Sequence, residues 1–422
     1  MERYTEEKLN KMSVHTLRVI LRSEFNGVPG VCNKNELISQ ILDIQAGASA
    51  PPRSTKGRKP LGEFITPLRE EISFSDVDED EELVKKGVFE LNADGFGFVR
   101  VNKLDGFVDF FVPKTLVKRF ALQTGDKVDC IVNYVSETGS LIVKTISLVN
   151  GKNPEDKNSR IQFSHLKAKY PKEKIELKRG KNAIIDSVDA FCPIGKGQRC
   201  LVEDDAGRFG TEFANALVDC IVEKDLQIIT IFAGVKPEAL EDIVQTENRQ
   251  YIALPINLSA EETLRIVNLA VERAKTMTAM GEHVLLVIDS LTYLVNVYED
   301  YILSNQTSSY LKSGLTPKKY ASELFGMGGN FGENSSLTIV ATIDSRRDEK
   351  ILGELSSIST SVIKLKGSDV VRRRGYVVDL LNSYTDKDEL LLGIEEIAYA
   401  DDERKQLAEN EDYLASIYNN LK

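Results

Sequence analysis

The spacing of hydrophobic residues changes several times along the chain, and each change predicts a different kind of structure. In the first part, apolar residues recur three or four positions apart in two short stretches, 9–21 and 37–42. Such spacing places them on one face of a helix. Two short amphipathic stretches in succession predict a helical hairpin. We therefore expect an N-terminal helical module over residues 1–46.

Residues 47–84 lose this periodicity and become rich in Ala, Pro, Ser and charge. A basic cluster at 53–59 is followed by an acidic run at 76–82. Blocks of like charge usually stay solvated and mobile. We expect a flexible charged linker over residues 47–84, in which the basic cluster serves as a solubilising spacer; contact with the RNA backbone is the alternative role of this cluster.

Between residues 85 and 150 the pattern shortens to strands of about five residues separated by Gly, Asp and Asn. Five strands over about 60 residues match a small closed barrel of the OB or cold-shock type. The expected strands are 88–91, 97–101, 107–112, 127–132 and 141–146.

Residues 151–422 alternate strand-like apolar runs with longer helical patterns. This alternation predicts a mainly parallel sheet covered by helices, so the predicted fold class is multidomain α+β and α/β. The expected strands are 197–202, 227–232, 283–288, 336–342 and 377–381, and the expected helices are 211–217, 237–244 and 260–279.

The composition fits a soluble protein of several domains, with 422 residues of which 42% are hydrophobic and 28% charged. No apolar run approaches the roughly 20 residues that cross a bilayer, and the first residues lack a signal-peptide pattern. We therefore expect a cytoplasmic protein without a membrane partner.

Metal and redox chemistry find little support in the sequence. The five cysteines are scattered without the paired spacing of zinc or disulfide sites, and there are only three histidines. We therefore expect buried reduced thiols and no metal site. The net charge of -11 excludes nonspecific polyanion binding by the whole molecule, so a nucleic-acid site must be a local basic or aromatic surface.

The predicted barrel carries aromatic residues at the spacing that single-stranded nucleic acid requires. Phe96 and Phe98 lie two positions apart, and therefore on one strand face, among glycines that let a base approach. A phenylalanine-rich barrel core is the alternative, because one member of each adjacent pair must point inward. The candidate RNA-binding residues are Phe96, Phe98, Phe110, Phe111, Arg119 and Phe120.

Residues 197–211 have the context of a phosphate-binding loop without its residues. A buried strand precedes the segment and a helix begins at Thr211. A nucleotide-binding loop would be glycine-rich and would end in Gly-Lys-Thr, so that N–H groups and one ammonium hold the phosphates. Here residues 203–210 read Glu-Asp-Asp-Ala-Gly-Arg-Phe-Gly, and Gly210 stands in the place of the lysine.

The order of these segments resembles the family of the bacterial transcription termination factor Rho. Residues 87–126, with Gly-Val-Phe-Glu-Leu and Asp-Gly-Phe-Gly-Phe-Val-Arg, are similar to its cold-shock-like RNA-binding domain. Residues 186–199, 284–292, 335–342 and 388–391 are similar to parts of its RecA-like ATPase domain. The resemblance covers nearly the whole chain and implies that the barrel binds single-stranded, pyrimidine-leaning RNA.

The same resemblance implies that several catalytic groups are missing. The position of the loop lysine corresponds to Gly210, and that of the glutamate that polarises water corresponds to Val235, which cannot accept a proton. The arginines that reach a neighbouring subunit correspond to Gly367 and Asn382, with Arg372–Arg374 lying between them. Asp204 and Asp205 also oppose nucleotide binding, because a carboxylate about 5 Å from a phosphate charge costs about 3 kcal/mol.

Several positions of the nucleotide site keep a suitable residue, and two nearby cations are candidates to replace the missing lysine. Asp289 corresponds to the aspartate that orients magnesium, although a strand-end aspartate that caps the next turn is an equal alternative. The nucleotide-site remnants are Gly207, Gly210, Thr211 and Asp289; the candidate substitute cations are Arg208 and Lys236; the candidates for a secondary RNA channel are Lys312, Lys318 and Lys319.

Three functional hypotheses follow. The first is a Rho-like RNA-binding protein acting in transcription termination or its regulation without ATP hydrolysis, in a homo- or hetero-oligomeric ring, with RNA polymerase or an intact Rho as partner. The second is an active RNA-dependent ATPase and translocase with an unconventional loop. The third is a plain RNA-binding scaffold. Binding of ATP and magnesium stays open, whereas the loss of lysine, glutamate and arginines together argues against turnover.

Overall fold

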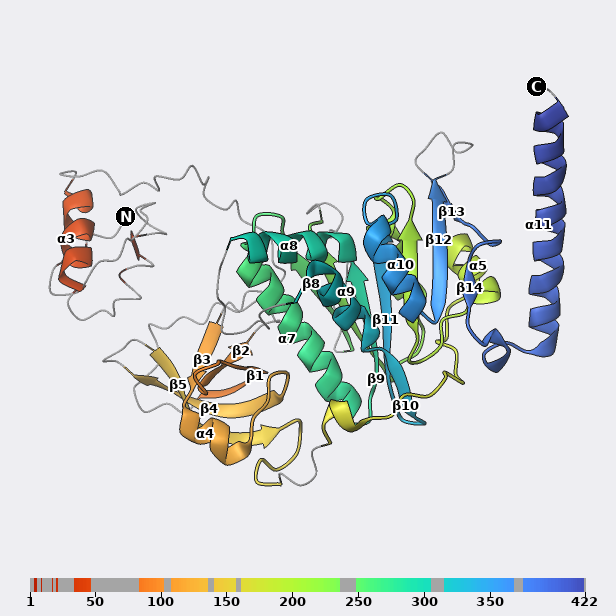
Figure 1. Cartoon of the computed structure of the whole chain (residues 1–422). Helices are drawn as coiled ribbons and strands as arrows, with labels where there is room; N and C mark the ends of the chain where they lie inside the picture. Colours follow the sequence, from red (N-terminus) through yellow and green to blue (C-terminus); the bar gives the residue numbers. More distant parts are fainter. Residues whose placement is uncertain are drawn as a thin grey trace.

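The computed structural model describes residues 4–5, 9, 17, 20–21, 34–46, 83–101, 108–135, 140–156, 161–235, 248–304, 315–367 and 375–420. Most of them form a small β-barrel and, beside it, a larger α/β domain (Figure 1). Residues 47–82, which make up nearly all of the expected linker, lie outside the described residues. None of the described helices is long and apolar enough to span a bilayer.

The N-terminal module has its own small core. Helix α3 spans Lys34–Gln45. Its apolar face, with Leu37, Ile38 and Ile41, is buried against Leu9 and three other apolar residues of the first stretch. The two apolar faces expected from the sequence therefore pack against each other.

Five strands close into the barrel in the order β1-β2-β3-β5-β4, as predicted from the sequence. Alternate residues of the strands point inward, and they fill the interior with Phe89, Val99, Phe110, Val128 and other apolar side chains. The elements are β1 (Leu83–Leu91), β2 (Gly97–Val101), β3 (Val108–Val112), α4 (Lys114–Phe120), β4 (Lys127–Val135) and β5 (Ser140–Val149).

The α/β domain is built on a sheet with the strand order β13-β12-β6-β11-β9-β7-β8. The pairs from β12 to β8 are all parallel, and β13 joins β12 antiparallel. The strands are β6 (Arg199–Asp204), β7 (Leu226–Ala233), β8 (Arg249–Leu254), β9 (His283–Asp289), β10 (Gly329–Gly332), β11 (Ser335–Asp344), β12 (Ser361–Gly367), β13 (Tyr376–Val378) and β14 (Tyr384–Thr385).

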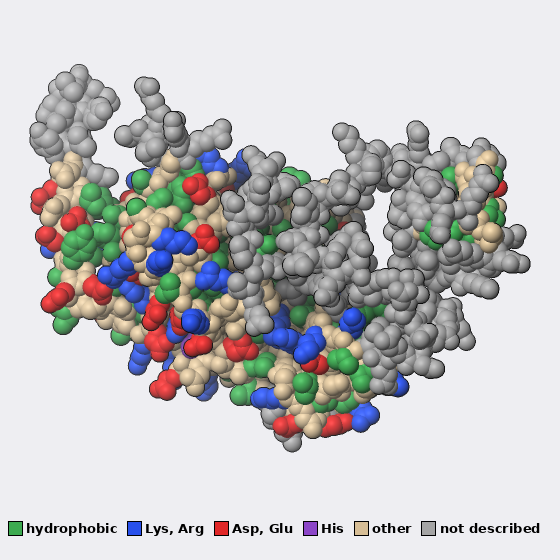
Figure 2. Space-filling model, turned by 180° about the vertical axis from the view of Figure 1, so that it is seen from behind, with side chains coloured by type: hydrophobic (Ala, Val, Ile, Leu, Met, Phe, Trp, Pro, Cys, Tyr) green, Lys and Arg blue, Asp and Glu red, His purple; other side chains and the backbone are tan. Residues whose placement is uncertain are grey.

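Helices cover both faces of this sheet, as the sequence pattern predicted. One core contains apolar residues of α7, α8, α9 and α10, and the opposite core contains those of α5 and α6. Acidic and basic side chains are interspersed on the face shown in Figure 2. The helices are η3 (Phe163–His165), α5 (Ala183–Phe191), α6 (Gly210–Cys220), α7 (Ala260–Ala279), α8 (Leu291–Leu303), α9 (Pro317–Gly326), α10 (Glu349–Ile358), η5 (Asp388–Leu390) and α11 (Ile394–Asn420).

One expected strand differs in its bounds, and one expected helix cannot be compared. The strand expected at 377–381 ends at Val378, because the chain turns at Asp379, whose carboxylate accepts hydrogen bonds from the backbone and the side chain of Asn382. The helix expected at 237–244 lies outside the described residues. The helix expected at 260–279 has these bounds in the structure, because Ser259 caps its first turn.

Two arginines of α7 hold the barrel against the α/β domain. Arg265 Nη1 lies 2.9 Å from Glu90 Oε2 on β1, and Arg273 Nη1 donates to the carbonyl oxygen of Gly125 at 3.2 Å and to Asn150 Oδ1 at 3.3 Å. Glu90 is only 1% exposed, so its charge depends on buried partners. The two arginines are about two helical turns apart, which fixes the barrel at two points along α7.

Gly125 of the barrel lies in close contact with α7. Its φ is +95°, and a Cβ atom there would lie 2.4 Å from the carbonyl oxygen of Glu272 on α7. Only glycine combines this backbone conformation with this contact. Gly151 has a similar φ of +74°, but a Cβ atom there would meet nothing within 4 Å.

We predict that Gly125→Ala destabilises the chain clearly more than Gly151→Ala. Both substitutions carry the cost of a left-handed alanine, about 1 kcal/mol, and only the first also forces the barrel away from α7. Urea unfolding of the two variants, with protease sensitivity between barrel and α/β domain as a second readout, measures the difference. Equal losses would show that the barrel does not depend on this contact.

Candidate functional site

The loop between β6 and α6 encloses the carboxylate of its own Asp204. Five consecutive backbone N–H groups, those of residues 206–210, donate to this side chain. Oδ1 accepts from the first two at 2.9 Å each, and Oδ2 accepts from the other three at 2.7, 2.6 and 3.2 Å. Asp204 is 3% exposed. The N–H groups of this loop are therefore already occupied by an anionic group.

This arrangement has the chemistry of an anion site. Converging N–H groups at a helix N-terminus favour a negative charge, whether it belongs to a phosphate or to a carboxylate. In this chain the carboxylate comes from the last residue of β6, which is covalently continuous with the loop. A phosphate can reach the same N–H groups only if it displaces Asp204.

The neighbouring carboxylates also have partners within the fold. Asp205 Oδ1 accepts from the backbone N–H of Gly367 at 3.0 Å, and Glu203 lies 3.2 Å from the ammonium of Lys364. The first contact ties the loop to the end of β12, and the second joins β6 to the middle of β12. Asp204 and Asp205, which were predicted to repel phosphate, thus also stabilise the loop through hydrogen bonds.

Gly210, in the place of the lysine, is closely surrounded. A Cβ atom at this position would lie 2.5 Å from Asp289 Oδ1 and 2.9 Å from Thr342 Oγ1. Distances under about 3 Å are too short for a carbon atom next to these oxygens. A lysine side chain therefore has no room here unless Asp289 and Thr342 move.

Asp289 lies at the end of β9, next to the loop. It is 2% exposed, and its Oδ1 accepts from the Thr342 hydroxyl at 2.8 Å. Burial raises the pKa of this carboxyl, whereas hydrogen bonds from Thr211 and Thr342 oppose the rise. Its Oδ2 has no hydrogen-bond partner among the described residues. Thr211 and Asp289, two of the predicted remnants, therefore lie together.

Asp289 does not cap the turn that follows, which was the alternative role considered for it. The N-cap of α8 is Ser290, whose hydroxyl accepts from the N–H of Tyr293 at 3.4 Å. The side chain of Asp289 instead points toward Gly210 and Thr342. The sequence left both roles of Asp289 open, because the direction of a side chain at the end of a strand cannot be read from local spacing alone.

The candidate substitute cation Arg208 contacts an aromatic ring. Its guanidinium carbon lies 4.9 Å from the centre of the Phe209 ring, and Phe209 is buried with its ring centre 4.9 Å from that of Tyr376. The backbone N–H of Arg208 donates to Asp204. The other candidate, Lys236, lies outside the described residues.

The positions assigned to the missing base and arginines hold no catalytic group. Val235 packs against the core on the α5 and α6 face. The Asn382 amide donates to Asp379 at 2.9 Å. Residues 368–374, with the three arginines between the two assigned positions, lie outside the described residues.

Three phenylalanines form a half-buried cluster on the outside of the barrel. The ring centres of Phe96, Phe98 and Phe111 are 5.4 to 6.0 Å apart, and Phe98 pairs with Phe111 across β2 and β3. Gly97 lies between the first two, and a Cβ atom there would collide with the Phe89 ring at 2.3 Å. The cluster, which we call the aromatic cluster, offers ring faces and edges to a ligand.

Two of the predicted RNA-binding residues are wrong. Phe110 is 1% exposed and Phe120 is 3% exposed, and both belong to the barrel core. Phe110 points opposite to its neighbour Phe111 because successive strand residues alternate. Phe120 ends α4 on its buried side. Arg119 is exposed and pairs with Glu155 at 2.7 Å.

A buried charge network under the aromatic cluster was missed by the sequence analysis. Arg100 lies 4.9 Å from the Phe98 ring centre and bonds both Glu90, at 2.6 Å, and Asp109. These carboxylates raise the pKa of Arg100 although burial alone would lower it. Arg265 of α7 shares Glu90. The network therefore links the aromatic cluster to the α/β domain, and only an arginine inside a strand pattern signalled it.

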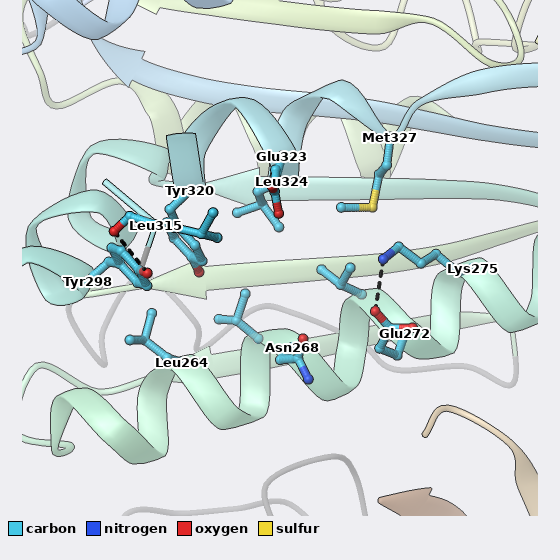
Figure 3. A pocket seen from close by; sticks show the side chains of 12 residues that line it. Leu264, Asn268, Glu272, Lys275, Tyr298, Leu315, Tyr320, Glu323, Leu324 and Met327 are labelled. Carbon is cyan, nitrogen blue, oxygen red and sulfur yellow. Dashed lines mark hydrogen bonds and ion pairs between the residues drawn. The ribbon is translucent and has the colours of Figure 1, made fainter. Parts of the chain in front are cut away.

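A cleft of about 120 Å³ lies between α7 and α9 (Figure 3), and none of the residues that line it belongs to the loop. Tyr298 and Tyr320 stack in it with ring centres 4.3 Å apart. Two channel candidates begin α9: Lys318 pairs with Glu354 at 2.7 Å, and Lys319 is exposed in the first turn. Lys312 lies outside the described residues.

Comparison with known proteins identifies both parts. Residues 85–155 match the RNA-binding domain of the Rho termination factor, and residues 185–371 match the nucleotide-binding domain of the ATP synthase alpha/beta family. The transcription termination factor Rho of Thermotoga maritima is 28% identical over 320 residues, which is 73% of this chain and 74% of that protein. The chain belongs to the Rho family.

A second Rho agrees with this membership. Rho of Bacillus subtilis is 26% identical over 360 residues, covering 82% of this chain and 84% of its own length. A solved ATPase from the type III secretion system of pathogenic bacteria is 18% identical, with a TM-score of 0.48, over 57% of this chain and 70% of its own. The family and the predicted fold class are confirmed, whereas the roles of individual residues of this Rho-family chain stay predictions.

We predict that Asp204→Ala lowers the free energy of unfolding by about 3 kcal/mol, because five N–H groups lose a charged acceptor. Asp205→Ala, which loses one such bond, serves as the control and should cost about 1 kcal/mol. Pyrophosphate should raise the melting temperature of Asp204→Ala alone, since only this variant exposes the N–H groups to an anion. Equal pyrophosphate effects on both variants would contradict the assignment.

Proposed function

We propose that this Rho-family chain binds single-stranded RNA with its barrel and acts in transcription termination or its regulation without hydrolysing ATP. The observation that carries the second half of this proposal is the enclosure of Asp204 by five backbone N–H groups. The first half rests on the family of the barrel and on the aromatic cluster.

RNA binding draws on stacking and on charge. Each base that stacks on an aromatic side chain contributes about 1 to 3 kcal/mol. Phe96, Phe98 and Phe111 offer such surfaces, and Arg119 supplies an exposed guanidinium. The relatives of this chain are named as transcription termination factors, which supports the same process here.

The proposal that the chain does not hydrolyse ATP rests on the loop, whose N–H groups are occupied by Asp204. Displacing Asp204 would remove a nearly buried carboxylate from five donors and leave it near Asp289. The incoming phosphates would find no lysine, because Gly210 replaces it. Val235 at the position of the water-polarising glutamate removes the general base. The residues present at this site therefore do not fit a nucleoside triphosphate.

A role in regulation follows from binding without turnover. A chain that holds RNA but does not translocate competes with an active Rho for the same transcript. It also has the family resemblance needed to enter a mixed ring, in which it would contribute a silent subunit. RNA polymerase and an intact Rho are the proposed partners for these two routes.

One observation favours the second candidate, an active RNA-dependent ATPase. Thr211 and Asp289 remain hydrogen-bonded, and a hydroxyl with a carboxylate is a donor set that suits Mg²⁺. If Mg²⁺ binds there, it would supply charge neutralisation for a phosphate group. Arg208 is the nearest cation in sequence, yet its guanidinium lies over Phe209.

We predict no RNA-stimulated ATP turnover by the purified full chain. With and without poly(C) RNA, the rate should stay below about 0.1 per second, at the low side of enzyme rates. A Rho that carries an intact Gly-Lys-Thr loop provides the comparison in the same assay. Turnover above this rate that disappears in Asp289→Asn would establish the active ATPase instead.

We predict that Phe98→Ala combined with Phe111→Ala weakens binding to a short cytidine oligonucleotide by about tenfold to a hundredfold, because stacking is lost. Fluorescence anisotropy measures the affinity, and Tyr399→Ala, an exposed aromatic on α11, is the matched control. Phe110→Ala should instead unfold the barrel, as core phenylalanines contribute about 3 to 5 kcal/mol. Unchanged RNA affinity in the folded double variant would defeat the stacking assignment.

A further inference from the structure

The segment that joins the barrel to the α/β domain is basic, although the chain as a whole is acidic. Residues 161–182 contain seven Lys and Arg residues and two Glu residues, against a net charge of -11 for the chain. We call this segment the basic strap. Because the whole molecule repels polyanions, such a local excess of positive charge marks where one could bind.

The strap is held against the α/β domain and not free to move. The backbone N–H of Lys169 donates to the carbonyl oxygen of Asn330 on β10 at 2.7 Å, and the strap bridges to Gly195 and Ile221 further along. Pro171 and Ile175 are buried against the domain. These contacts present the side chains between them on a fixed surface.

The two ends of the strap differ in how their charges are neutralised. At the end nearer α5, Lys174 and Arg179 pair with Asp189 at 3.0 and 3.3 Å, and Arg179 also reaches Glu396 at 3.2 Å. At the other end, the exposed side chains of Lys167, Lys169 and Lys172 make no ion pair with any part of the chain that the structure describes. The free positive charge is therefore concentrated at residues 167–172.

An exposed aromatic ring lies among these lysines. Tyr170 is 51% exposed, and the ammonium of Lys387 lies 4.4 Å from its ring centre. A cation on an aromatic ring is a favourable contact, and a ring that remains half-exposed can still stack on a base. Cations around an accessible aromatic ring are the combination by which proteins hold single strands.

We propose that Tyr170, with Lys167, Lys169 and Lys172, forms a second contact for single-stranded RNA outside the barrel. The inference rests on the proposed function, since it requires RNA to be the ligand of the chain. The ring favours RNA over an acidic protein surface, because lysines alone would suffice for carboxylates. An OB-type barrel covers about 4 to 16 nucleotides, so a longer strand is needed to reach the strap.

Two lengths of oligocytidine separate the strap from the barrel, about 8 and about 40 nucleotides. Replacing Lys167, Lys169 and Lys172 by Gln should leave the affinity for the short RNA unchanged and lower the affinity for the long RNA by about tenfold. The slope of log affinity against log salt should fall by about 2 for the long RNA, since each single-strand phosphate contact contributes about 0.7. Tyr170→Ala should also lower the affinity for the long RNA, whereas Tyr170→Phe should bind the long RNA like the unmodified chain.

A matched triple variant controls for net charge. Lys224, Arg346 and Lys405 are also exposed, and their replacement by Gln removes the same charge without touching the basic strap. This variant should bind both RNAs like the unmodified chain. Folding of all variants is checked by thermal melting, and each variant is compared at several salt concentrations.

Distinct outcomes overturn the strap and the proposed function. If the short RNA binds and the strap variant keeps full affinity for the long RNA, the proposed RNA contact at the basic strap is wrong, while the proposed function stands. If the unmodified chain binds neither RNA, the proposed function itself fails. If the strap variant loses affinity for polyglutamate but not for RNA, the surface serves an acidic protein, and the RNA assignment is overturned.

Discussion

The N–H groups of the loop before α6 and of the first residue of α6 need a hydrogen-bond acceptor, and in this chain Asp204 provides it from within. A helix N-terminus exposes N–H groups that its own carbonyls cannot reach. Here the N–H of Gly210, the first residue of α6, and those of the four loop residues before it converge on one carboxylate that is 3% exposed. Loop, strand β6 and helix α6 are thereby fixed to each other without any ligand. The fold needs no nucleotide to satisfy this part of its backbone.

Other features of the site are consistent with this internal acceptor. With the loop closed on Asp204, Gly210 comes so near to Asp289 that no larger residue fits. The absent lysine and the present aspartate are therefore two aspects of one arrangement. Asp289 keeps Thr342 and Thr211 as hydrogen-bond donors, and its raised pKa reflects burial without a compensating cation.

The sequence predicted much of the fold because its patterns are local. Helix α7 and the five barrel strands follow from spacing and from turn residues, and the absence of lysine at 210 can be read directly. The roles of Asp204 and of Phe110 could not be predicted, because they depend on which way a side chain points. The contact between Glu90 and Arg265 joins residues far apart in the chain, and no local pattern encodes it.

The charge network of the barrel limits what RNA binding can do here. Arg100 lies under Phe98 and shares Glu90 with Arg265, so a ligand on the aromatic cluster is mechanically linked to α7. A ligand shifts a conformational equilibrium only by its differential affinity for the two states. In an active motor, nucleotide turnover resets that equilibrium in each cycle. Under the function proposed above, the loop stays closed on Asp204, no such reset is supplied, and RNA bound to this chain acts through occupancy instead of movement.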